Sequence, residues 1–242
     1  MAQLIKLDRY VSRYEDNLFH YASQYIKIKQ GKWAAFKNQS DLKLSNKMRH
    51  TFHKTMFRHQ LVWASSTLNQ RSEIMDIYKH HQELQFLLSN FSDTVLLMFH
   101  PIIQNGQLNT IMIHPGMVWN VKLLLGETDS VFQGDTNGTW QEITSNGRRS
   151  MDSPLHSIHQ SATSLKKLLA GEQQQMPVHH YVLAPNSFIE NYYPTGNVDI
   201  VDKRQFLDLQ RKGLDSGQPM RHQQLNLAKW LLEKTETTAI SR

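Results

Sequence analysis

Three apolar segments separated by turn residues follow one another in residues 93–125, which read DTVLLMFHPIIQNGQLNTIMIHPGMVWNVKLLL. The first ends at His100-Pro101, the second at Pro115-Gly116, and the third runs from Met117 to Leu125. Short runs rich in Val, Ile and Leu and bounded by Gly, Pro and Asn are typical of β-strands. Because the connections are short, the pattern predicts a three-stranded antiparallel meander.

Helices are predicted on both sides of this meander. Before it, an apolar stripe at helical spacing begins after Ser72, an acceptable N-cap, and extends to Leu88. After it, Ser153 and Pro154 begin a helix that ends at Gly171. The pattern then predicts several further elements: a hairpin around 131–140, a buried strand over 178–184, a strand over 198–201, a helix over 202–213 and a helix over 219–235. We therefore expect an α/β protein with a mixed central sheet flanked by helices.

The composition excludes several classes of protein. Of the 242 residues 39% are hydrophobic and none is Cys, which excludes disulfide frameworks, thiolate nucleophiles and Cys-ligated zinc. The longest uninterrupted apolar run, Val95 to Phe99, is far shorter than a membrane span, and charged residues such as Lys6 and Asp8 interrupt the first segment of the chain. The sequence also lacks a Walker loop, a dinucleotide-binding glycine pattern and a nucleophile elbow. We expect a soluble, cytoplasmic protein with no membrane partner and no cofactor.

Positive charge is concentrated in the first quarter of the chain. Residues 1–60 contain 12 Lys and Arg against 4 Asp and Glu, whereas the whole chain has a net charge of +6. The segment is also rich in aromatic residues and is predicted to be helical. Alternating rings and cations suit nucleic acid, but they also suit helices whose rings pack on a neighbouring element, and we favour packing for the rings. Nine basic residues are the candidate phosphate contacts: Lys27, Lys29, Lys32, Lys37, Lys43, Lys47, Arg49, Lys54 and Arg58.

The order of helix, meander, helix and strands resembles the nuclease-related domain, NERD, a bacterial family of the restriction-endonuclease-like superfamily. The stretch 108–122, with its Pro115-Gly116 turn, corresponds to the family's Glu-x-Asp strand, Ser-Pro-x-Gly turn and Glu-x-Lys strand. A glycine-bearing hairpin ending in Trp140 and the helix start at Ser153-Pro154 continue the likeness. The resemblance implies a restriction-endonuclease-like fold, with a basic helical region over residues 1–71, a NERD-like domain over 72–212 and a C-terminal helix over 213–242.

The chain departs from the family at the positions that bind metal. The degenerate motif positions are Glu73 on the first helix, Asn109 in place of the metal-binding Asp, and Lys122. When the family's Glu-x-Lys strand is aligned without a gap, Lys122 stands at the position of the Glu and Leu124 at the position of the catalytic Lys. When the alignment includes a two-residue gap, Asn120 stands at the position of the Glu and Lys122 at that of the Lys. Because Mg²⁺ prefers carboxylate oxygens, both alignments predict a pseudoenzyme without a metal site. The basic residues of the N-terminal region predict that this protein associates with nucleic acid.

Two alternatives stay open at this point. The first is an active Mg²⁺-dependent nuclease with rearranged ligands, in which Glu73, Glu127 and Asp129 converge beside Lys122. The second is a protein-interaction module, which predicts a contiguous exposed apolar patch and no nucleic acid.

Overall fold

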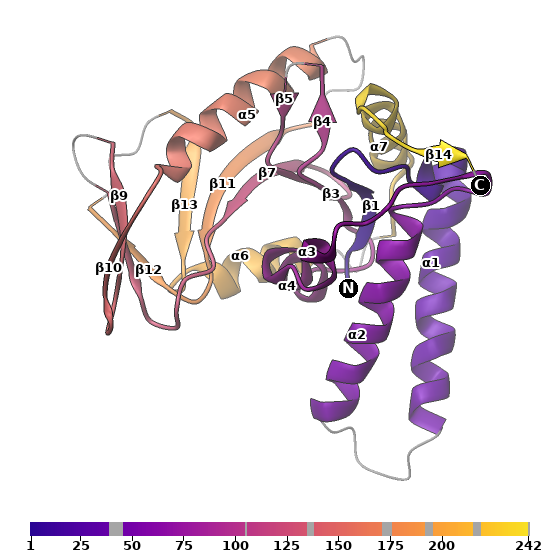
Figure 1. The fold of residues 1–242 in the computed structure, drawn as a ribbon, viewed down its shortest axis with the longest axis horizontal. Coiled ribbons are helices and arrows are strands. Elements are labelled where there is room, and N and C mark those ends of the chain that lie inside the picture. The colour runs from indigo at the N-terminus through magenta and orange to yellow at the C-terminus, as the bar shows by residue number, and fades with distance from the viewer. Residues whose placement is uncertain are drawn as a thin grey trace.

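The fold is centred on a mixed six-stranded sheet with the strand order β1-β3-β6-β7-β11-β13 (Figure 1). The computed structural model describes residues 1–38, 46–104, 106–134, 138–170, 176–191, 196–214 and 219–241. The strands of this sheet are β1 (Gln3–Leu7), β3 (Leu96–Phe99), β6 (Thr110–Ile113), β7 (Val118–Leu123), β11 (Val178–Ala184) and β13 (Val198–Asp202). The prediction of an α/β protein with a mixed central sheet flanked by helices is confirmed.

The predicted meander forms the middle of this sheet. Strand β3 pairs antiparallel with β6, and β6 pairs antiparallel with β7, so that Leu96 lies opposite Ile113 and Thr110 lies opposite Val121. Nearly every residue of the three strands is buried, because helices cover both faces of the sheet. Strand β11 then adds parallel to β7, and β13 adds parallel to β11, as expected for strands that follow crossover connections.

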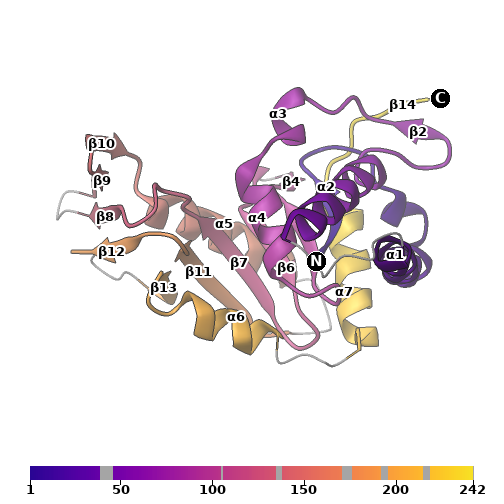
Figure 2. The same cartoon turned by 90° about the horizontal axis from the view of Figure 1, so that it is seen from below.

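Helix α5 (Pro154–Leu169) crosses one face of β7 and β11, whereas α4 (Gln82–Asn90) and α6 (Phe206–Leu214) cover the opposite face (Figures 1 and 2). Phe91, at the end of α4, packs edge-on against the buried ring of Trp119 in β7, with the ring centroids 5.9 Å apart. Phe86 of α4 and Phe206 of α6 are in ring contact at 5.6 Å. The sheet is therefore the middle layer of a three-layer arrangement.

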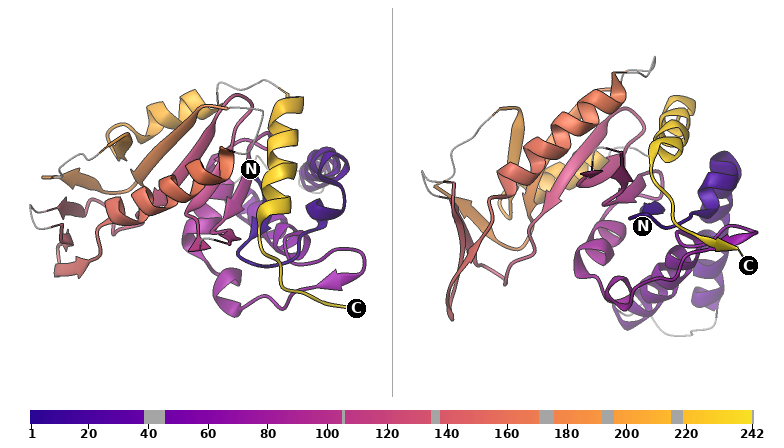
Figure 3. Two further views of the ribbon diagram at one scale, coloured as in Figure 1. Left: turned by 90° about the horizontal axis from the view of Figure 1, so that it is seen from above. Right: turned by 45° about the horizontal axis from the view of Figure 1, so that its top comes forward.

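The N-terminal region differs from the prediction, because residues 3–7 form an edge strand of the central sheet. Strand β1 pairs parallel with β3, and the helices α1 (Arg13–Asn38) and α2 (Asn46–Trp63) form a hairpin between these two strands in sequence. Helix α7 (His222–Lys234) packs beside α1 (Figure 3). One hydrophobic core contains residues from all three predicted segments, 1–71, 72–212 and 213–242. The strand over Gln3–Leu7 was not predicted because the charged residue Lys6 interrupts its apolar pattern. In the structure the side chain of Lys6 is completely buried.

The aromatic residues of α1 and α2 pack on one another, as the sequence favoured. Tyr14 and Tyr25 are almost fully buried, and both rings lie edge-on to Trp63 of α2. Nearer the tip of the hairpin, Trp33 and Phe36 contact Phe52. The rings therefore form the interface between the two helices instead of a free stacking surface.

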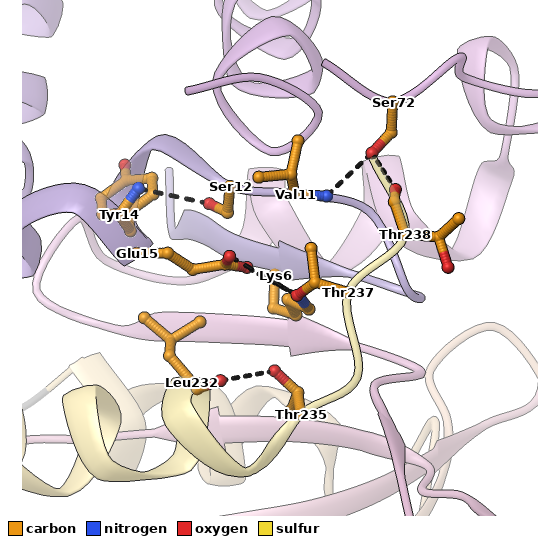
Figure 4. Close-up of polar contacts among 10 residues, drawn as sticks. All are labelled: Lys6, Val11, Ser12, Tyr14, Glu15, Ser72, Leu232, Thr235, Thr237 and Thr238. Atoms are coloured by element: carbon orange, nitrogen blue, oxygen red, sulfur yellow. Dashed lines mark hydrogen bonds and ion pairs between the residues drawn. The ribbon is translucent and has the colours of Figure 1, made fainter. Parts of the chain in front are cut away.

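Two further elements differ from the predicted order. The helix expected at Ser72 begins later, as a short turn α3 (Asp76–Lys79) followed by α4. The Ser72 hydroxyl makes tertiary contacts instead of capping a helix: it accepts from the Val11 N–H at 2.9 Å and donates to the Thr238 carbonyl at 2.6 Å (Figure 4). The predicted hairpin extends into a second sheet of order β10-β9-β8-β12. Its strands are β8 (Val131–Gly134), β9 (Trp140–Thr144), β10 (Gly147–Met151) and β12 (Phe188–Glu190).

A segment after α7, the C-terminal strap (residues 235–241), lies beside β1 and the residues that follow it, where the Thr238 N–H donates to the Arg9 carbonyl at 2.7 Å (Figure 4). The ammonium group of Lys6 lies 2.7 Å from the Glu15 carboxylate and donates to the Thr237 hydroxyl at 2.7 Å. Short strands pair elsewhere along the chain: β2 (Gln70–Arg71) with β14 (Ile240–Ser241), and β4 (Ile102–Ile103) with β5 (Gly106–Gln107).

Candidate functional site

The polar residues expected at a nuclease-like centre meet at one end of the central sheet. Leu7 pairs with Phe99, and Thr110 pairs with Val121. The next residues of these four strands form a row at the sheet end, which we call the sheet-end row: Asp8, His100, Asn109 and Lys122. The structure therefore brings two of the three predicted motif positions, Asn109 and Lys122, onto neighbouring strands. Sequence analysis missed Asp8 and His100 because it did not place β1 in the sheet.

The backbone at this end of the sheet is strained. Asp8 and His100 both have left-handed conformations, with φ of 49° and 47°. Such conformations are uncommon for residues other than glycine and persist only where the surrounding structure enforces them. One Asp8 carboxylate oxygen accepts the Tyr78 hydroxyl proton at 2.8 Å, whereas the other is buried without a hydrogen-bond partner in the described structure. Burial, followed by the positive charges of Lys122 and His81, lowers the pKa of His100 to about 4, so its ring is neutral near pH 7.

The helix carboxylate beside Lys122 is Glu83 and not Glu73. Glu73 is exposed on the segment between β2 and α3, where no described side chain of the sheet end reaches it. Glu83 lies in the first turn of α4, where burial raises the pKa of its carboxyl group against the opposing effects of Lys122 and His81. The sequence prediction failed here because Ser72 makes tertiary hydrogen bonds, which displaces the helix start toward Glu83.

Asn109 and Asn120, which the resemblance aligns with acidic ligands, are part of a hydrogen-bonded chain under α5. The backbone N–H of Asn109 donates to the Ser161 hydroxyl at 3.0 Å, and this hydroxyl donates to Oδ1 of Asn120 at 3.0 Å. Oδ1 of Asn109 accepts the Ser157 hydroxyl proton at 2.9 Å, and Nδ2 of Asn120 lies 3.1 Å from Nδ1 of His180. Both amide oxygens are therefore occupied by protein donors. A buried chain of this kind fixes the orientation of every member.

The rearranged ligand set for Mg²⁺ does not assemble. Asp129 lies on the exposed loop after β7 and forms an ion pair with Lys203, which follows β13. Glu73 lies on a different part of the molecule, between β2 and α3. Glu127 lies on the same loop as Asp129, with its backbone N–H donating to Glu142 at 3.0 Å. Among the residues that the structure describes, no three His, Asp or Glu side chains are grouped so that they could hold a metal ion.

The nine predicted phosphate contacts fall into different environments. Lys29 already forms a 2.7 Å ion pair with Asp93, which compensates its charge, and Lys37 lies over the ring of Trp33. Lys32 is half-buried on α1, whereas five of the nine are exposed: Lys27, Lys37, Arg49, Lys54 and Arg58. Lys43 lies outside the described residues, and the side chain of Lys47 is not described either.

Acidic residues are sparse on the α1–α2 hairpin. Between Asn17 and Gln60 the only acidic residue in the sequence is Asp41, which lies outside the described residues, whereas the same stretch contains all nine candidates. The effect reaches nearby histidines: burial, then Lys32 and Arg13, lowers the pKa of His59 to about 4. The hairpin is consequently electropositive along both helices.

A groove lies between α2 and the α3–α4 segment and has a volume of about 570 Å³; we call it the α2–α3 groove. Lys54, Arg58 and Lys79 line it together with three histidines, and no Asp or Glu is among its described lining residues. Lys79 is paired with Asp76, whereas Lys54 and Arg58 form no ion pair with the described chain. The sequence pointed to Lys54 and Arg58, but it gave no sign that α3 would supply the opposite wall.

The fold and these two regions define a mixed α/β protein with a metal-ligand-poor polar sheet end and a separate cationic groove. Comparison of the chain with protein-family models, with curated proteins and with solved structures found no match. Within the described helices, none combines the length and the apolar character that crossing a membrane requires.

Proposed function

We propose that the protein associates with nucleic acid through the α2–α3 groove, on a NERD-related, restriction-endonuclease-like scaffold that has lost metal-dependent cleavage. The scaffold half of this proposal is supported by the chain order α4, β3-β6-β7, α5 and β11. In this order an antiparallel meander is followed by a helix and a strand parallel to the last strand of the meander. This is the order of elements on which the resemblance was based.

The loss of cleavage is supported by the chemistry of the sheet end. Asn109 and Asn120 present neutral amides where the family places acids, and both amide oxygens accept hydrogen bonds from serines of α5. A divalent cation would have to displace these donors and would gain no negative charge in return. Glu83 remains near Lys122, but a single carboxylate is a poor site for Mg²⁺.

The observation that carries nucleic-acid binding is the α2–α3 groove, where Lys54 and Arg58 on the α2 wall form no ion pair with the described chain, while Lys79 on the opposite wall is paired with Asp76. Lys54 and Arg58 are four residues apart on α2 and therefore project from the same side of the helix. Such a pair can contact neighbouring phosphates of one strand, which releases counterions and favours binding at low salt. The floor of the groove contains Phe57 and Leu61, which are buried, so the ligand is held by its backbone and without preference for sequence.

The experiment is a fluorescence-anisotropy titration of purified protein against plasmid fragments and short single strands, at about 50 and 200 mM salt. We expect the double variant Lys54→Ala/Arg58→Ala to bind at least about tenfold more weakly, and its dependence of log K on log salt to fall by about 1.5. The matched control is Lys167→Ala/Lys229→Ala, which removes two exposed cations from α5 and α7 and causes the same change in net charge.

Three outcomes would overturn parts of the proposal. Absence of binding at low salt, or equal weakening by the control, removes the groove as the nucleic-acid site. Mg²⁺-dependent cleavage that Glu83→Ala or Glu73→Ala abolishes would show that the scaffold is still a nuclease.

A protein partner is the second candidate function, because large apolar side chains are exposed beside the groove. Val62, Leu68, Met75 and Ile77 are each more than half exposed, and Val62 and Met75 line the same surface depression. Exposed apolar side chains of this kind are what the interaction-module alternative requires. If the protein binds nucleic acid through the groove, the double variant Met75→Ser/Ile77→Ser should leave the affinity for nucleic acid unchanged. If the protein binds a protein partner through these side chains, the variant should lose that partner, and unchanged retention of the partner would refute this second function.

A further inference from the structure

A further pocket shares no lining residue with the α2–α3 groove and lies on the α5 side of the central sheet. This pocket, which we call the α5 pocket, has a volume of about 780 Å³ and lies between the second half of α5, the beginnings of β11 and β13, and α7. Its walls are mainly apolar and include Leu165, Met176, Val198 and Leu227. Pockets of this size with apolar walls and few polar groups are typical of small-molecule sites.

One of the polar groups that line the α5 pocket is the imidazole of His180, at the end of the chain of hydrogen bonds that begins at Asn109; the others belong to His159, Thr163, Lys166 and Asn197. Because the Ser161 hydroxyl accepts the Asn109 N–H, its own proton is directed to Oδ1 of Asn120. The amide group of Asn120 therefore turns its Nδ2–H₂ donor toward Nδ1 of His180, 3.1 Å away. Nδ1 is then an acceptor, so the ring proton of neutral His180 lies on Nε2.

This chain is rigid, because Asn120 is completely buried and Ser161 is 2% exposed. His180 lines the pocket with its Nδ1 edge bonded to Asn120, which leaves Nε2–H as the ring's available donor. Burial, with His159 and His179, lowers the pKa of His180 against the effect of Asp199, and this keeps the ring neutral at pH 7. The residues at the nuclease-like positions are thus used to hold a hydrogen-bond donor at a different place.

The charges around the α5 pocket favour an anion. Lys166 of α5 is exposed and lines the pocket, and no Asp or Glu is among its described lining residues. Asp199, the acid that acts on His180, lies on the exposed side of β13 and is not a lining residue. A carboxylate would therefore meet one ammonium group and one oriented N–H, which are charge-assisted hydrogen-bond donors.

We propose that the α5 pocket binds a small carboxylic acid with an apolar body, whose carboxylate is held by Nε2–H of His180 and the ammonium group of Lys166. The apolar walls bury the body of the ligand. The site does not depend on the nucleic-acid proposal, because it shares no lining residue with the α2–α3 groove.

The test compares three probes that share one ring system and differ in the head group: 2-naphthoate, 2-naphthylmethanol and 2-naphthylmethylammonium. Their affinities for the full-length protein are measured by isothermal titration calorimetry. We expect naphthoate to bind at least about tenfold more tightly than the alcohol, and the ammonium probe to bind more weakly still. Equal affinities for the three probes, or no binding of naphthoate at about 1 mM, would overturn the proposal.

Variants locate the site. Ala162→Trp fills the pocket and should abolish binding of naphthoate and of the alcohol, whereas His180→Phe should remove the preference for the carboxylate and retain part of the affinity for the ring. Lys166→Gln should weaken naphthoate several-fold, and Lys167→Gln, one residue along α5 but outside the lining, should leave it unchanged. Urea midpoints of all four variants report whether they fold. If folded Ala162→Trp and His180→Phe proteins bind naphthoate as the wild type does, the acid binds elsewhere and the proposal fails.

Discussion

The imidazole of His114 should make the protein acid-sensitive by an amount that the structure sets. The side chain lies directly after β6, is 3% exposed and packs against Trp119 with the ring centroids 4.0 Å apart. Its Nε2 atom is buried and has no hydrogen-bond partner in the described structure. Burial alone lowers the pKa of His114 from 6.5 to about 3.

The sign of the effect follows from proton linkage. Between pH 6.5 and 3 the unfolded chain binds a proton at His114 and the folded chain does not, so stability is fully present above pH 6.5 and is lost as the pH falls. With 1.36 kcal/mol per pKa unit, lowering the pH from 7 to 5 costs about 2 kcal/mol of the unfolding free energy. This value changes little for any folded-state pKa below about 4, because the folded ring is then neutral at pH 5.

The assay is urea unfolding at pH 7 and pH 5, followed by tryptophan fluorescence, for the wild type and for His114→Phe. Phe is close in size to His and suits a site lined by Phe91 and Trp119. We expect the variant to lose about 2 kcal/mol less than the wild type between the two pH values. His156→Phe, at an exposed position of α5, is the control and should behave as the wild type does. If the His114→Phe protein loses as much stability as the wild type, the burial argument is refuted.

Three further predictions concern stability and can be read from urea midpoints. Glu15→Gln leaves the ammonium group of Lys6 buried without its ion-pair partner and should lower the unfolding free energy by about 3 kcal/mol. The double variant Lys6→Met/Glu15→Gln should recover most of that loss, and no recovery would contradict the ion-pair argument. Gly126→Ala places a Cβ atom 2.5 to 2.7 Å from three side-chain oxygens and should cost about 2 kcal/mol, so a neutral effect would show that these side chains move freely. Ser161→Ala breaks two buried hydrogen bonds and should lower the unfolding free energy by about 2 kcal/mol. Thr163→Ala removes an exposed hydroxyl and is the control. A smaller loss for Ser161→Ala than for Thr163→Ala would contradict the role of Ser161 in the chain under α5.

The central part of the fold was predictable because its signals are local. The turns at His100-Pro101 and Pro115-Gly116 separate runs that can only be strands, and Pro154 begins α5 where its missing N–H costs nothing. Two of the three differences from the prediction arose where tertiary contacts override local preference. Ser72 is a good N-cap in isolation, yet it bonds Val11 and Thr238, and the buried Lys6 hides an edge strand.

The sheet-end row and the chain under α5 could be predicted only in part. Asn109 and Lys122 were assigned from the meander, since strand register places them on neighbouring strands. Ser161 and His180 come from a helix and a strand more than 40 residues away, and nothing in their local sequence marks them as partners of Asn120. The residue type alone shows that a buried amide needs hydrogen-bond partners. Which residues provide them depends on how the helices and strands pack.

The attachment of the C-terminal strap has a consequence for how the chain reaches its native state. Strand β1 pairs with a strand some 90 residues further along the chain, and the buried ammonium group of Lys6 donates a hydrogen bond to Thr237, near the end of the chain described. Contacts so distant in sequence are slow to form, because a large loop must close before any of them is gained. We expect docking of the strap to be a late event in refolding. Intermediates that lack it would leave the buried ammonium group of Lys6 without its hydrogen bond to Thr237, so they would be less stable than the native protein.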